Sequence, residues 1–423
     1  MDRDNGSLAD VSGGSGFKPS PTLQRVAAGQ LCTGCGLCAS LSEGAIGMAS
    51  LPPGYSRPVQ RAALSSDCER IIAATCPGVQ VAAWPAAPIV HPSWGPIVSL
   101  ETGFADDPDV RFKGSSGGAV TALALFALES GLVDRVVHVG ADLEDPAANR
   151  VLVSRSPDEV IAGAGSRYVS SSPLIEIQQM LAEGGSMAFV GKPCDVSALR
   201  QLAKVDPRVD RHIPLMLAFF CAGIPSRNAV DRVLAVLDAP TQDLAAFRYR
   251  GNGWPGKAAA VRKDGSVSER RYEESWGGYL SHEVQFRCKI CPDAVGGGAD
   301  IACADAWYGG ETGYPTFEEH DGRSLIASRT ARGEQILRAA IAAGRLSSEP
   351  LALDQIDLMQ PSQAARKSLV QARVAAVATL GRPWPRMVGL KVSAAAQTAP
   401  AALKLKNFLG TIRRALRGRL SRR

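Results

Sequence analysis

The chain is organised around the stretch Leu31-Cys32-Thr33-Gly34-Cys35-Gly36-Leu37-Cys38. Three cysteines recur at a strict two-residue spacing, and two glycines stand between them. Thiolates spaced in this way can turn towards one centre, and the small residues let the backbone come close to it. The pattern is typical of a cubane iron–sulfur cluster, for which the usual bacterial run ends with a fourth cysteine followed by proline.

The fourth ligand must come from elsewhere, because residues 41–44 contain no cysteine. Cys76 precedes Pro77 and supplies the missing pair, with Cys68 as the less favoured substitute. The alternative interpretation is a structural zinc site, since paired cysteines at this spacing also bind zinc. A third cysteine at the same interval favours iron–sulfur, and with it a redox protein.

Composition describes an ordinary soluble protein long enough for two or three domains. Of the 423 residues, 45% are hydrophobic and 21% are charged. The sequence contains no run of about 18 apolar residues, so no transmembrane helix is predicted. The N-terminus lacks the features of a secretory signal. Ten cysteines without an export signal favour thiolate ligands in a reducing cytoplasm over disulfides.

The net charge of +6 is concentrated at the C-terminus. Residues 401–423 contain eight Lys and Arg and no acid, so the rest of the chain has a net charge of −2 and is not a nucleic-acid binder by charge. Apolar residues recur there at helical intervals: Leu405, Phe408, Leu409, Ile412, Leu416 and Leu420. They predict an amphipathic helix that could lie on an anionic membrane surface. The alternatives are a disordered basic tail and a helix packed on a partner.

Changes in composition and hydrophobic pattern along the chain predict six parts and a mixed α/β fold. The parts are a disordered lead (1–20), a small N-terminal iron–sulfur unit (21–90), two successive parts of an α/β domain (97–184 and 185–345), a helical extension (346–396) and a basic amphipathic tail (397–423). The expected helices in the α/β domain span 119–130, 174–183, 196–203 and 227–237, with strands over 133–140, 186–190 and 215–220. A hairpin is expected to turn at 263–265, and residues 330–375 are predicted to be helical.

Two units in this domain share the order strand, cysteine, helix. Cys194 follows strand 186–190, and Cys221 follows strand 215–220. Such units in series predict neighbouring parallel strands whose carboxyl ends form the ligand-binding edge of an open sheet. With the Cys-x2-Cys pair Cys288 and Cys291, these two thiols predict a second four-cysteine site. A reactive single thiol at Cys194 is the rival interpretation, but no histidine lies nearby to activate it.

Two other cysteines receive structural interpretations. Cys303 lies in an apolar alternating run and is predicted to be a buried core residue. Cys68 is predicted to be helical and structural. Either remains an alternative to one of the assigned ligands.

The glycine-rich stretch Lys113-Gly114-Ser115-Ser116-Gly117-Gly118 precedes an apolar helix and resembles a phosphate cradle. It is neither a Walker A sequence nor a three-glycine dinucleotide fingerprint, and the alternative is tight packing at a helix start. Gly165-Ser166-Arg167-Tyr168 could add hydroxyls, an arginine and an aromatic ring. Clusters carry single electrons while most organic reductions need two, so a flavin is a plausible converter.

Together the motifs resemble those of the beta subunits of coenzyme F420-dependent hydrogenases and dehydrogenases, with the related 7-hydroxymethyl chlorophyll a reductases and ferredoxin-type divinyl chlorophyllide reductases. The resemblance covers residues 25–345. It rests on Cys32-x2-Cys35-x2-Cys38, Gly114-Ser115-Ser116-Gly117-Gly118, Gly165-Ser166-Arg167-Tyr168, Gly191-Lys192-Pro193-Cys194, Cys221-Ala222-Gly223, Gly253-Trp254, Cys288-x2-Cys291 and Asp300-x4-Asp305-x-Trp307, in this order.

The resemblance implies FAD in addition to the two 4Fe-4S clusters predicted from the cysteines. The implied flavin-binding residues are Lys113, Gly114, Ser115, Ser116, Gly117, Gly118, Ser166, Arg167, Tyr168 and Lys192. Lys192 replaces a threonine of the family pattern and Ala222 a histidine, and Ala304-Asp305-Ala306-Trp307-Tyr308 departs from Gly-Asp-x-Trp-Gly. These changes bear on the substrate and the donor. Asp305 and Tyr168 are the candidate proton donors.

The leading functional prediction is a cytoplasmic oxidoreductase. A one-electron donor such as ferredoxin, or reduced coenzyme F420, would feed the clusters and FAD, which would reduce a small organic substrate. The second prediction is an electron-transfer subunit of a larger complex without a substrate of its own, and the third is a zinc-stabilised scaffold. Peripheral contact with the inner membrane surface is expected through residues 401–423. No nucleic-acid partner is expected, and the oligomeric state is not predicted.

Overall fold

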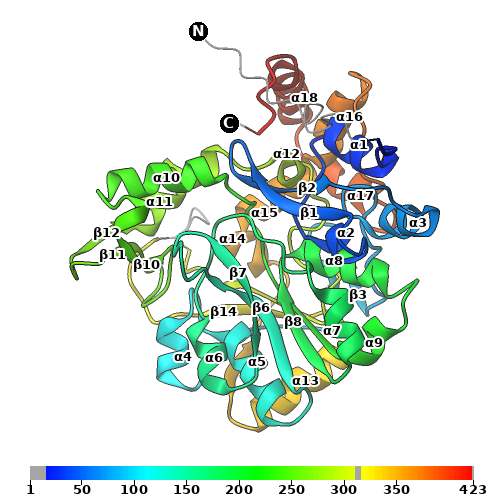
Figure 1. The fold of residues 1–423 in the computed structure, drawn as a ribbon. Helices are drawn as coiled ribbons and strands as arrows, with labels where there is room; N and C mark the ends of the chain where they lie inside the picture. The colour runs from blue at the N-terminus through cyan, green and yellow to red at the C-terminus, as the bar shows by residue number, and fades with distance from the viewer. Residues whose placement is uncertain (1–15, 310–315, 422–423) are drawn as a thin grey trace.

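The computed structural model describes residues 16–309 and 316–421 (Figure 1). Most of the predicted disordered lead, residues 1–15, lies outside the described residues. An eight-stranded sheet forms the centre of the molecule, in the order β15-β5-β14-β13-β9-β8-β6-β7. The strands are β5 (Ser99–Ala105), β6 (Arg135–Ala141), β7 (Asn149–Ser154), β8 (Met187–Gly191), β9 (Leu215–Phe219), β13 (Ile301–Asp305), β14 (Ser324–Ser328) and β15 (Leu346–Pro350). The mixed α/β fold class is confirmed.

The four consecutive strands β13, β9, β8 and β6 are parallel, and the remaining strand pairs on either side of them are antiparallel. A parallel strand in the middle of a sheet is covered on both faces, so it tends to be apolar throughout. In β9, Leu215 and Leu217 join the core cluster that includes α5 (Ala119–Glu129) and α13 (Ala331–Ala342). Met216 and Ala218 join the opposite cluster, with α7 (Ile177–Glu183), α8 (Pro193–Leu202) and α9 (Arg208–His212).

The predicted pairing of the two strand–cysteine–helix units is confirmed, because β8 and β9 lie side by side and parallel. Helix α8 begins at Pro193, however, so Cys194 lies in its first turn and not in the loop expected before residue 196. Proline fits the first helical turn because its missing N–H would be unpaired there.

The prediction that residues 330–375 are all helical is wrong for Leu346–Pro350. This segment is β15, an edge strand that pairs antiparallel with β5. Its five residues carry no strong strand preference, and the partner strand lies far away in the sequence. The strand therefore owes its existence to tertiary pairing, which overrides local propensity.

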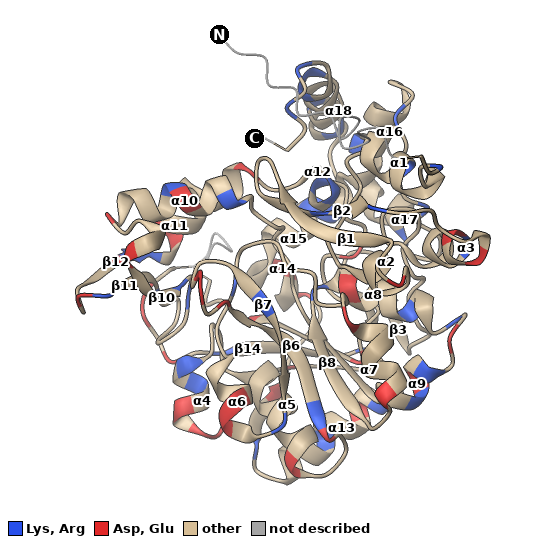
Figure 2. Cartoon of the chain, in the orientation of Figure 1, with Lys and Arg blue, Asp and Glu red and all other residues tan. Residues whose placement is uncertain are grey.

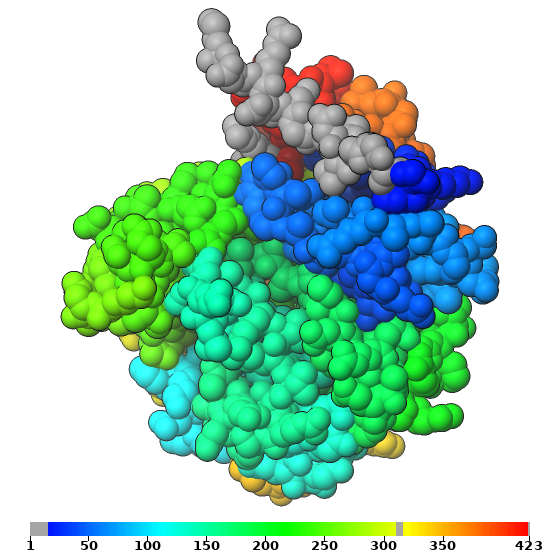
Figure 3. Space-filling model, in the orientation of Figure 1, coloured from blue at the N-terminus to red at the C-terminus, as the bar shows by residue number. Residues whose placement is uncertain are grey.

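The N-terminal unit contains α1 (Pro21–Ala28), α2 (Leu37–Ser40), α3 (Ser66–Thr75) and the hairpin of β1 (Ile46–Leu51) and β2 (Tyr55–Gln60). It packs against helices from the other end of the chain, since Val26 and Leu31 share an apolar cluster with Val377 and Ala415. In Figure 3 the blue N-terminal unit lies directly against the green segments of the sheet domain and the orange C-terminal helices.

Smaller elements complete the fold. They are β3 (Ile89–His91), β4 (Gly95–Ile97), α4 (Pro108–Lys113), α6 (Pro157–Ala162), α10 (Arg227–Val236), β10 (Leu244–Arg248), β11 (Lys257–Arg262), β12 (Val267–Arg271), α11 (Tyr272–Gly278), α12 (Phe286–Lys289), α14 (Gln355–Met359), α15 (Pro361–Ser368), α16 (Val370–Ala378) and α17 (Val392–Gln397). The hairpin of β11 and β12 turns at residues 263–266, as predicted.

The basic tail forms helix α18 (Ala401–Leu416), which packs on α16 of the same chain. Leu405, Leu409 and Leu416 are exposed beside the basic residues that Figure 2 shows in blue. Leu420 does not share this face as predicted, because it lies beyond the helix end and is buried. No helix in the described ranges has both the length and the apolar character needed to cross a bilayer.

We expect His138 on β6 to make stability depend on pH. The ring is buried and its Nε2 lies 2.7 Å from the Ser154 hydroxyl. Burial lowers the pKa of His138 from its usual 6.5 to about 4. The unfolded chain therefore takes up the proton first, and stability falls as the pH drops from about 6.5 to about 4. The loss approaches about 3 kcal/mol, at 1.36 kcal/mol per pKa unit.

Chemical denaturation at several pH values measures this effect. His138→Gln should flatten the acid limb of the curve, whereas His282→Gln, at an exposed position, should not. Parallel curves for unaltered protein and His138→Gln would contradict the assignment.

Candidate functional site

The first cysteine set lines a cavity in the N-terminal unit. Cys32, Cys35, Cys38 and Cys76 all lie on its wall. The rest of the wall is apolar or small: Leu23, Val26, Thr33, Gly36, Leu37, Met48, Pro58, Ile72 and Thr75. The structure thus brings the Cys-x2-Cys-x2-Cys run and the distant Cys-Pro pair together.

Glycine is required where the run turns. Gly36 has a φ of +86° and precedes α2. A Cβ atom there would lie 2.9 Å from the Ser172 Cβ and 3.0 Å from the Ile175 amide nitrogen. The amide of Gly34 donates to Cys32 Sγ at 3.3 Å. The small residues therefore let the backbone fold tightly around the thiols, as expected from the sequence.

The thiols of this set act on one another electrostatically. Burial and then the charges of Asp195 and Cys76 raise the pKa of Cys35 above its ordinary range. Burial and then Cys32 raise the pKa of Cys76 to about 11. Four thiolates can coexist here only with positive charge among them, which is what the iron of a cluster supplies. The donor set fits such a group.

The second cysteine set lines another cavity. Cys194 comes from the first turn of α8, Cys221 from the segment after β9, and Cys288 and Cys291 from α12 and the residues that follow it. The other wall residues are Thr33, Pro193, Gly223, Ile224, Gln285, Arg287, Asp293 and Arg366. Burial and then Cys288 raise the pKa of Cys221 to about 12, so these two thiols lie close enough to act on each other.

The two remaining cysteines line neither of these cavities. Cys68 lies on α3, where its thiol donates to the Leu41 carbonyl at 3.3 Å. Cys303 lies on β13 in the central core, and burial raises its pKa to about 12. Over the described part of the chain, no three His, Cys, Asp or Glu side chains are grouped so as to hold a single metal ion.

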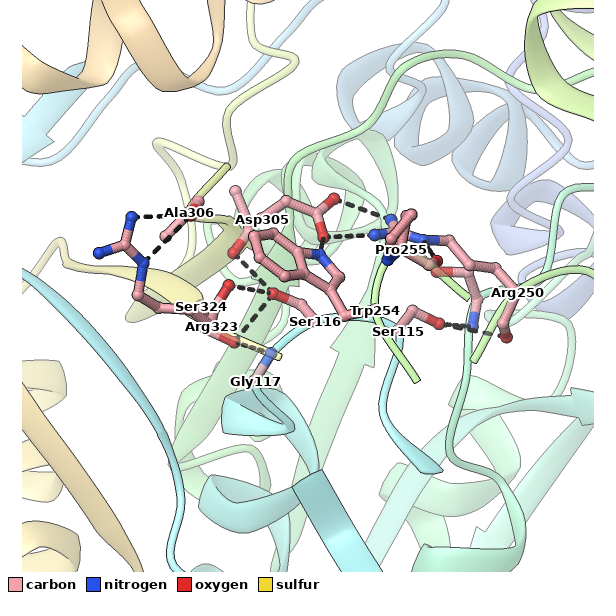
Figure 4. Close-up of polar contacts among 12 residues, drawn as sticks. Ser115, Ser116, Gly117, Arg250, Trp254, Pro255, Asp305, Ala306, Arg323 and Ser324 are labelled. Atoms are coloured by element: carbon pink, nitrogen blue, oxygen red, sulfur yellow. Dashed lines mark hydrogen bonds and ion pairs between the residues drawn. The ribbon is translucent and has the colours of Figure 1, made fainter. Parts of the chain in front are cut away.

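The glycine-rich loop joins α4 to α5, and its two serine hydroxyls bond within the protein. Ser115 Oγ accepts from the Ser166 amide and donates to the Arg250 carbonyl, while Ser116 Oγ donates to the Arg323 carbonyl at 2.8 Å (Figure 4). A Cβ on Gly117 would lie 2.7 Å from the Gly103 carbonyl oxygen. The loop is thus tightly packed, which was the alternative interpretation of this motif.

The backbone of this loop still offers donors to an anion. Gly118 caps the eleven-residue helix α5 with a φ of +75°. The amides of Ser115, Ser116 and Gly118 have no acceptor within the described part of the chain. A helix N-terminus with free amides favours negative charge, so this loop fits a phosphate group through its main chain.

The other predicted flavin contacts differ in how free their side chains are. Arg167 is committed to the protein, since it donates to Asn149 and to the carbonyls of Phe247, Pro146 and Ala148. Lys192 is buried beside the second cysteine set and pairs with Asp195 at 2.7 Å. Tyr168 lies among aromatic rings, with its centroid 5.1 Å from that of Trp276.

Asp305 forms a largely buried ion pair with Arg250. The guanidinium contacts both carboxylate oxygens, at 2.7 and 2.9 Å, and the Trp254 indole N–H donates to the same carboxylate at 2.8 Å (Figure 4). Trp254 also stacks on Trp307, with centroids 4.8 Å apart. The Gly-Trp and Asp-x-Trp motifs therefore form one cluster behind the glycine-rich loop. Held by three donors, Asp305 is poorly placed to donate a proton.

Several wall residues were not predicted from the sequence. Thr33 lines both cavities, Gln285 and Arg287 line the second, and Arg366 donates to the Cys221 carbonyl at 3.1 Å. Gln285 and Arg287 closely precede Cys288, so adjacency to a ligand was the signal available for them. Arg366 carries no such signal, because it comes from the separate helix α15.

Comparison with known proteins places these motifs in a family context. Residues 101–179 match the family model for the N-terminal part of the coenzyme F420 hydrogenase/dehydrogenase beta subunit, and residues 184–353 match the model for its C-terminal part. The chain is 28% identical to the coenzyme F420 hydrogenase subunit beta of Methanococcus voltae over 287 residues, which cover 66% of this chain and 95% of that protein.

Two further similarities come from a plant protein and a solved structure. The chain is 27% identical to the chloroplastic 7-hydroxymethyl chlorophyll a reductase of Oryza sativa over 55% of this chain and 47% of that protein. A chain in a xenon-derivatised structure of the F420-reducing [NiFe] hydrogenase complex from Methanosarcina barkeri has a TM-score of 0.52 and 22% identity. The match covers 68% of this chain and 96% of that one, and it supports the fold.

Proposed function

Because this chain belongs to the coenzyme F420 hydrogenase/dehydrogenase beta-subunit family, we propose that it is an electron-transfer subunit of a larger oxidoreductase complex. The observation that carries the proposal is the pair of four-cysteine cavities that share a wall at Thr33. Two adjacent redox sites form a relay, whereas a zinc-stabilised scaffold has no need for the second to adjoin the first.

In this proposal each cavity holds one 4Fe-4S cluster. Cys32, Cys35, Cys38 and Cys76 hold the first, and Cys194, Cys221, Cys288 and Cys291 hold the second. The chain supplies one thiolate for each iron of a cubane. The carboxyl ends of β8 and β9 carry Cys194 and Cys221, so the second cluster joins the sheet edge where α/β proteins bind ligands.

FAD is the proposed converter between single electrons and electron pairs. The free amides of Ser115, Ser116 and Gly118 would bind its phosphates at the start of α5. The hydroxyls of Ser115 and Ser116 hold the loop in place, and Arg167 supports the neighbouring segment 146–149 from inside. Lys192 and Tyr168 remain proposed neighbours of the flavin, with Lys113 and Ser166 at the loop's edge.

The comparisons favour this relay over the leading prediction from the sequence. The relatives that match along most of their own length are named as subunits, and the similar structure is a chain of a complex. A reductase that acts alone on an organic substrate would need a proton donor beside the flavin. Of the two candidates, Asp305 is instead engaged by Arg250 and Trp254, which leaves only Tyr168.

A reductive titration of the isolated chain tests the relay. Anaerobic protein should accept about four electrons, one per cluster and two for FAD, and then stop until an acceptor such as an oxidised dye is added. Absorption at the flavin and cluster bands follows the uptake. A chain that carries neither iron nor flavin would refute the proposal. Continuous consumption of reductant with a small organic acceptor would restore the leading prediction.

We also propose that the exposed face of α18 makes peripheral contact with an anionic membrane surface. Leu405 and Leu409 are 58% and 55% exposed, and basic residues flank them. Each basic residue near the lipid would add about 1 kcal/mol. The full chain should sediment with anionic vesicles at low salt, and a chain ending at residue 396 should not. Leu405→Gln with Leu409→Gln should weaken sedimentation while leaving the buried face of α18 intact. Equal pelleting of all forms would remove the idea.

A further inference from the structure

Thr33 is the common wall of the two cysteine cavities. It follows Cys32 directly, is only 3% exposed and lines both cavities. An electron that moves between the two sites passes this shared wall. Its preferred direction depends on the relative reduction potentials of the two sites. The residues on each wall set those potentials through hydrogen bonds and charge.

Gln285 brings an unpaired donor to the second cavity. Its side chain is 1% exposed and lines that cavity. The amide oxygen accepts from Arg57 Nη1 at 3.2 Å, which fixes the other end of the amide as the N–H₂ group. Nε2 is buried and has no acceptor in the described part of the protein. A buried unpaired donor is unfavourable unless a ligand in the cavity accepts its hydrogen bond.

Arg287 brings a buried positive charge. It is 2% exposed, lines the second cavity, and donates from Nε and Nη2 to the Pro77 carbonyl at 3.3 and 3.0 Å. Pro77 follows Cys76 of the first set, so this one side chain spans both sites. No carboxylate pairs with Arg287 in the described ranges of the chain. Burying an unpaired charge is unfavourable, and a negatively charged group in the adjacent cavity would compensate it.

The walls of the two cavities differ in charge. Apart from its cysteines, the first wall holds no ionisable side chain among the described residues. The second wall holds Arg287, Arg366 and one carboxylate, Asp293, which accepts from the Gly297 amide at 2.8 Å. The nearby Lys192 and Asp195 form a pair without net charge. The second site is therefore the more electropositive of the two.

We propose that Gln285 and Arg287 are positioning residues that hold the second cluster at a higher reduction potential than the first. Reduction adds one negative charge to a cluster, and N–H donors and a buried cation stabilise that added charge. One electron would then leave the reduced first site and enter the oxidised second site past Thr33, with no bond formed or broken. The inference rests on the proposed function, since it requires a cluster in each cavity.

An EPR-monitored redox titration of the full, anaerobically purified chain tests this inference. Cys35→Ser and Cys291→Ser assign the signals, because each removes one cluster. Gln285→Leu should lower the potential of the second cluster and leave the first unchanged. Arg287→Met should lower the second more strongly and the first slightly. A tenfold shift in the ratio of reduced second to reduced first cluster corresponds to 59 mV, and we expect Arg287→Met to reach about this size.

Controls separate this role from a structural one. Gln201→Leu removes a similarly buried glutamine that lines neither cavity, and it should leave both potentials unchanged. Arg287→Lys keeps the charge and should retain most of the difference even if Arg287→Met loses iron. A first cluster with the higher potential, or an unchanged ratio in Gln285→Leu, would overturn this inference alone. Fewer than two clusters in the unaltered chain would overturn it together with the proposed function.

Discussion

Protein made and purified without oxygen is expected to be brown and to contain about eight iron atoms per chain, as two cubane clusters require. Cys35→Ser and Cys291→Ser should each lose about half of this iron. The two residues lie in different cavities, and each lines its cavity together with the other three cysteines of its set. Removing one thiolate should therefore empty its own cavity and leave the other filled.

The chain provides matched controls for the iron measurement. Cys68→Ser and Cys303→Ala change the two cysteines that lie off both cavities, and each should retain the full iron content. Iron and acid-labile sulfide analysis, with the visible spectrum, gives the result. A colourless protein with one or two zinc ions would end the redox proposal. Loss of iron in Cys68→Ser would instead indicate that Cys68, and not Cys76, is the fourth ligand of the first site.

The cysteine geometry could be anticipated because it depends on short-range rules. Two-residue spacing with glycines fixes the local turn at Cys32–Cys38, and a cysteine after each of two parallel strands must reach the same sheet edge. In both cases the positions follow from backbone periodicity and strand order. The same rules place Cys303 in the core, because successive side chains of β13 point to opposite faces of a sheet that is covered on both sides.

The electrostatic environment of the cysteines could not be anticipated in this way. Arg287 reaches Pro77, which is 210 residues away in the sequence, only because α12 packs against the N-terminal unit. Arg366 reaches the Cys221 carbonyl from a C-terminal helix. The hydrogen-bond partners of the serines in the glycine-rich loop could not be anticipated either. Their hydroxyls fitted the composition of a phosphate cradle, but in the structure they form hydrogen bonds with the Arg250 carbonyl and with Ser324 of β14.

Reduced ferredoxin, or a low-potential dye in its place, should reduce the bound flavin rapidly, whereas NADH and NADPH should not do so without an added reductase. The glycine spacing of a dinucleotide fingerprint occurs at residues 251–256, but this run joins β10 to β11 and opens no helix, so it is not a nicotinamide site. Two clusters are also redundant for hydride transfer from a nicotinamide. They suit a donor that delivers one electron at a time. The first cysteine set lies in the small N-terminal unit, and Cys32 and Cys38 are only partly buried, so we expect entry there.

Anaerobic stopped-flow at the flavin band, with each donor in turn, measures this route. Cys35→Ser should lose rapid reduction by ferredoxin, and Cys68→Ser should keep it, because only Cys35 lines the first cavity. The competing donor is reduced deazaflavin, which would meet the FAD directly by hydride transfer and would be indifferent to Cys35→Ser. If ferredoxin reduces the flavin of Cys35→Ser at an unchanged rate, the N-terminal cluster is not the entry point. Electrons would then enter at the second site, whose wall carries Arg287 and Arg366, or at the flavin itself.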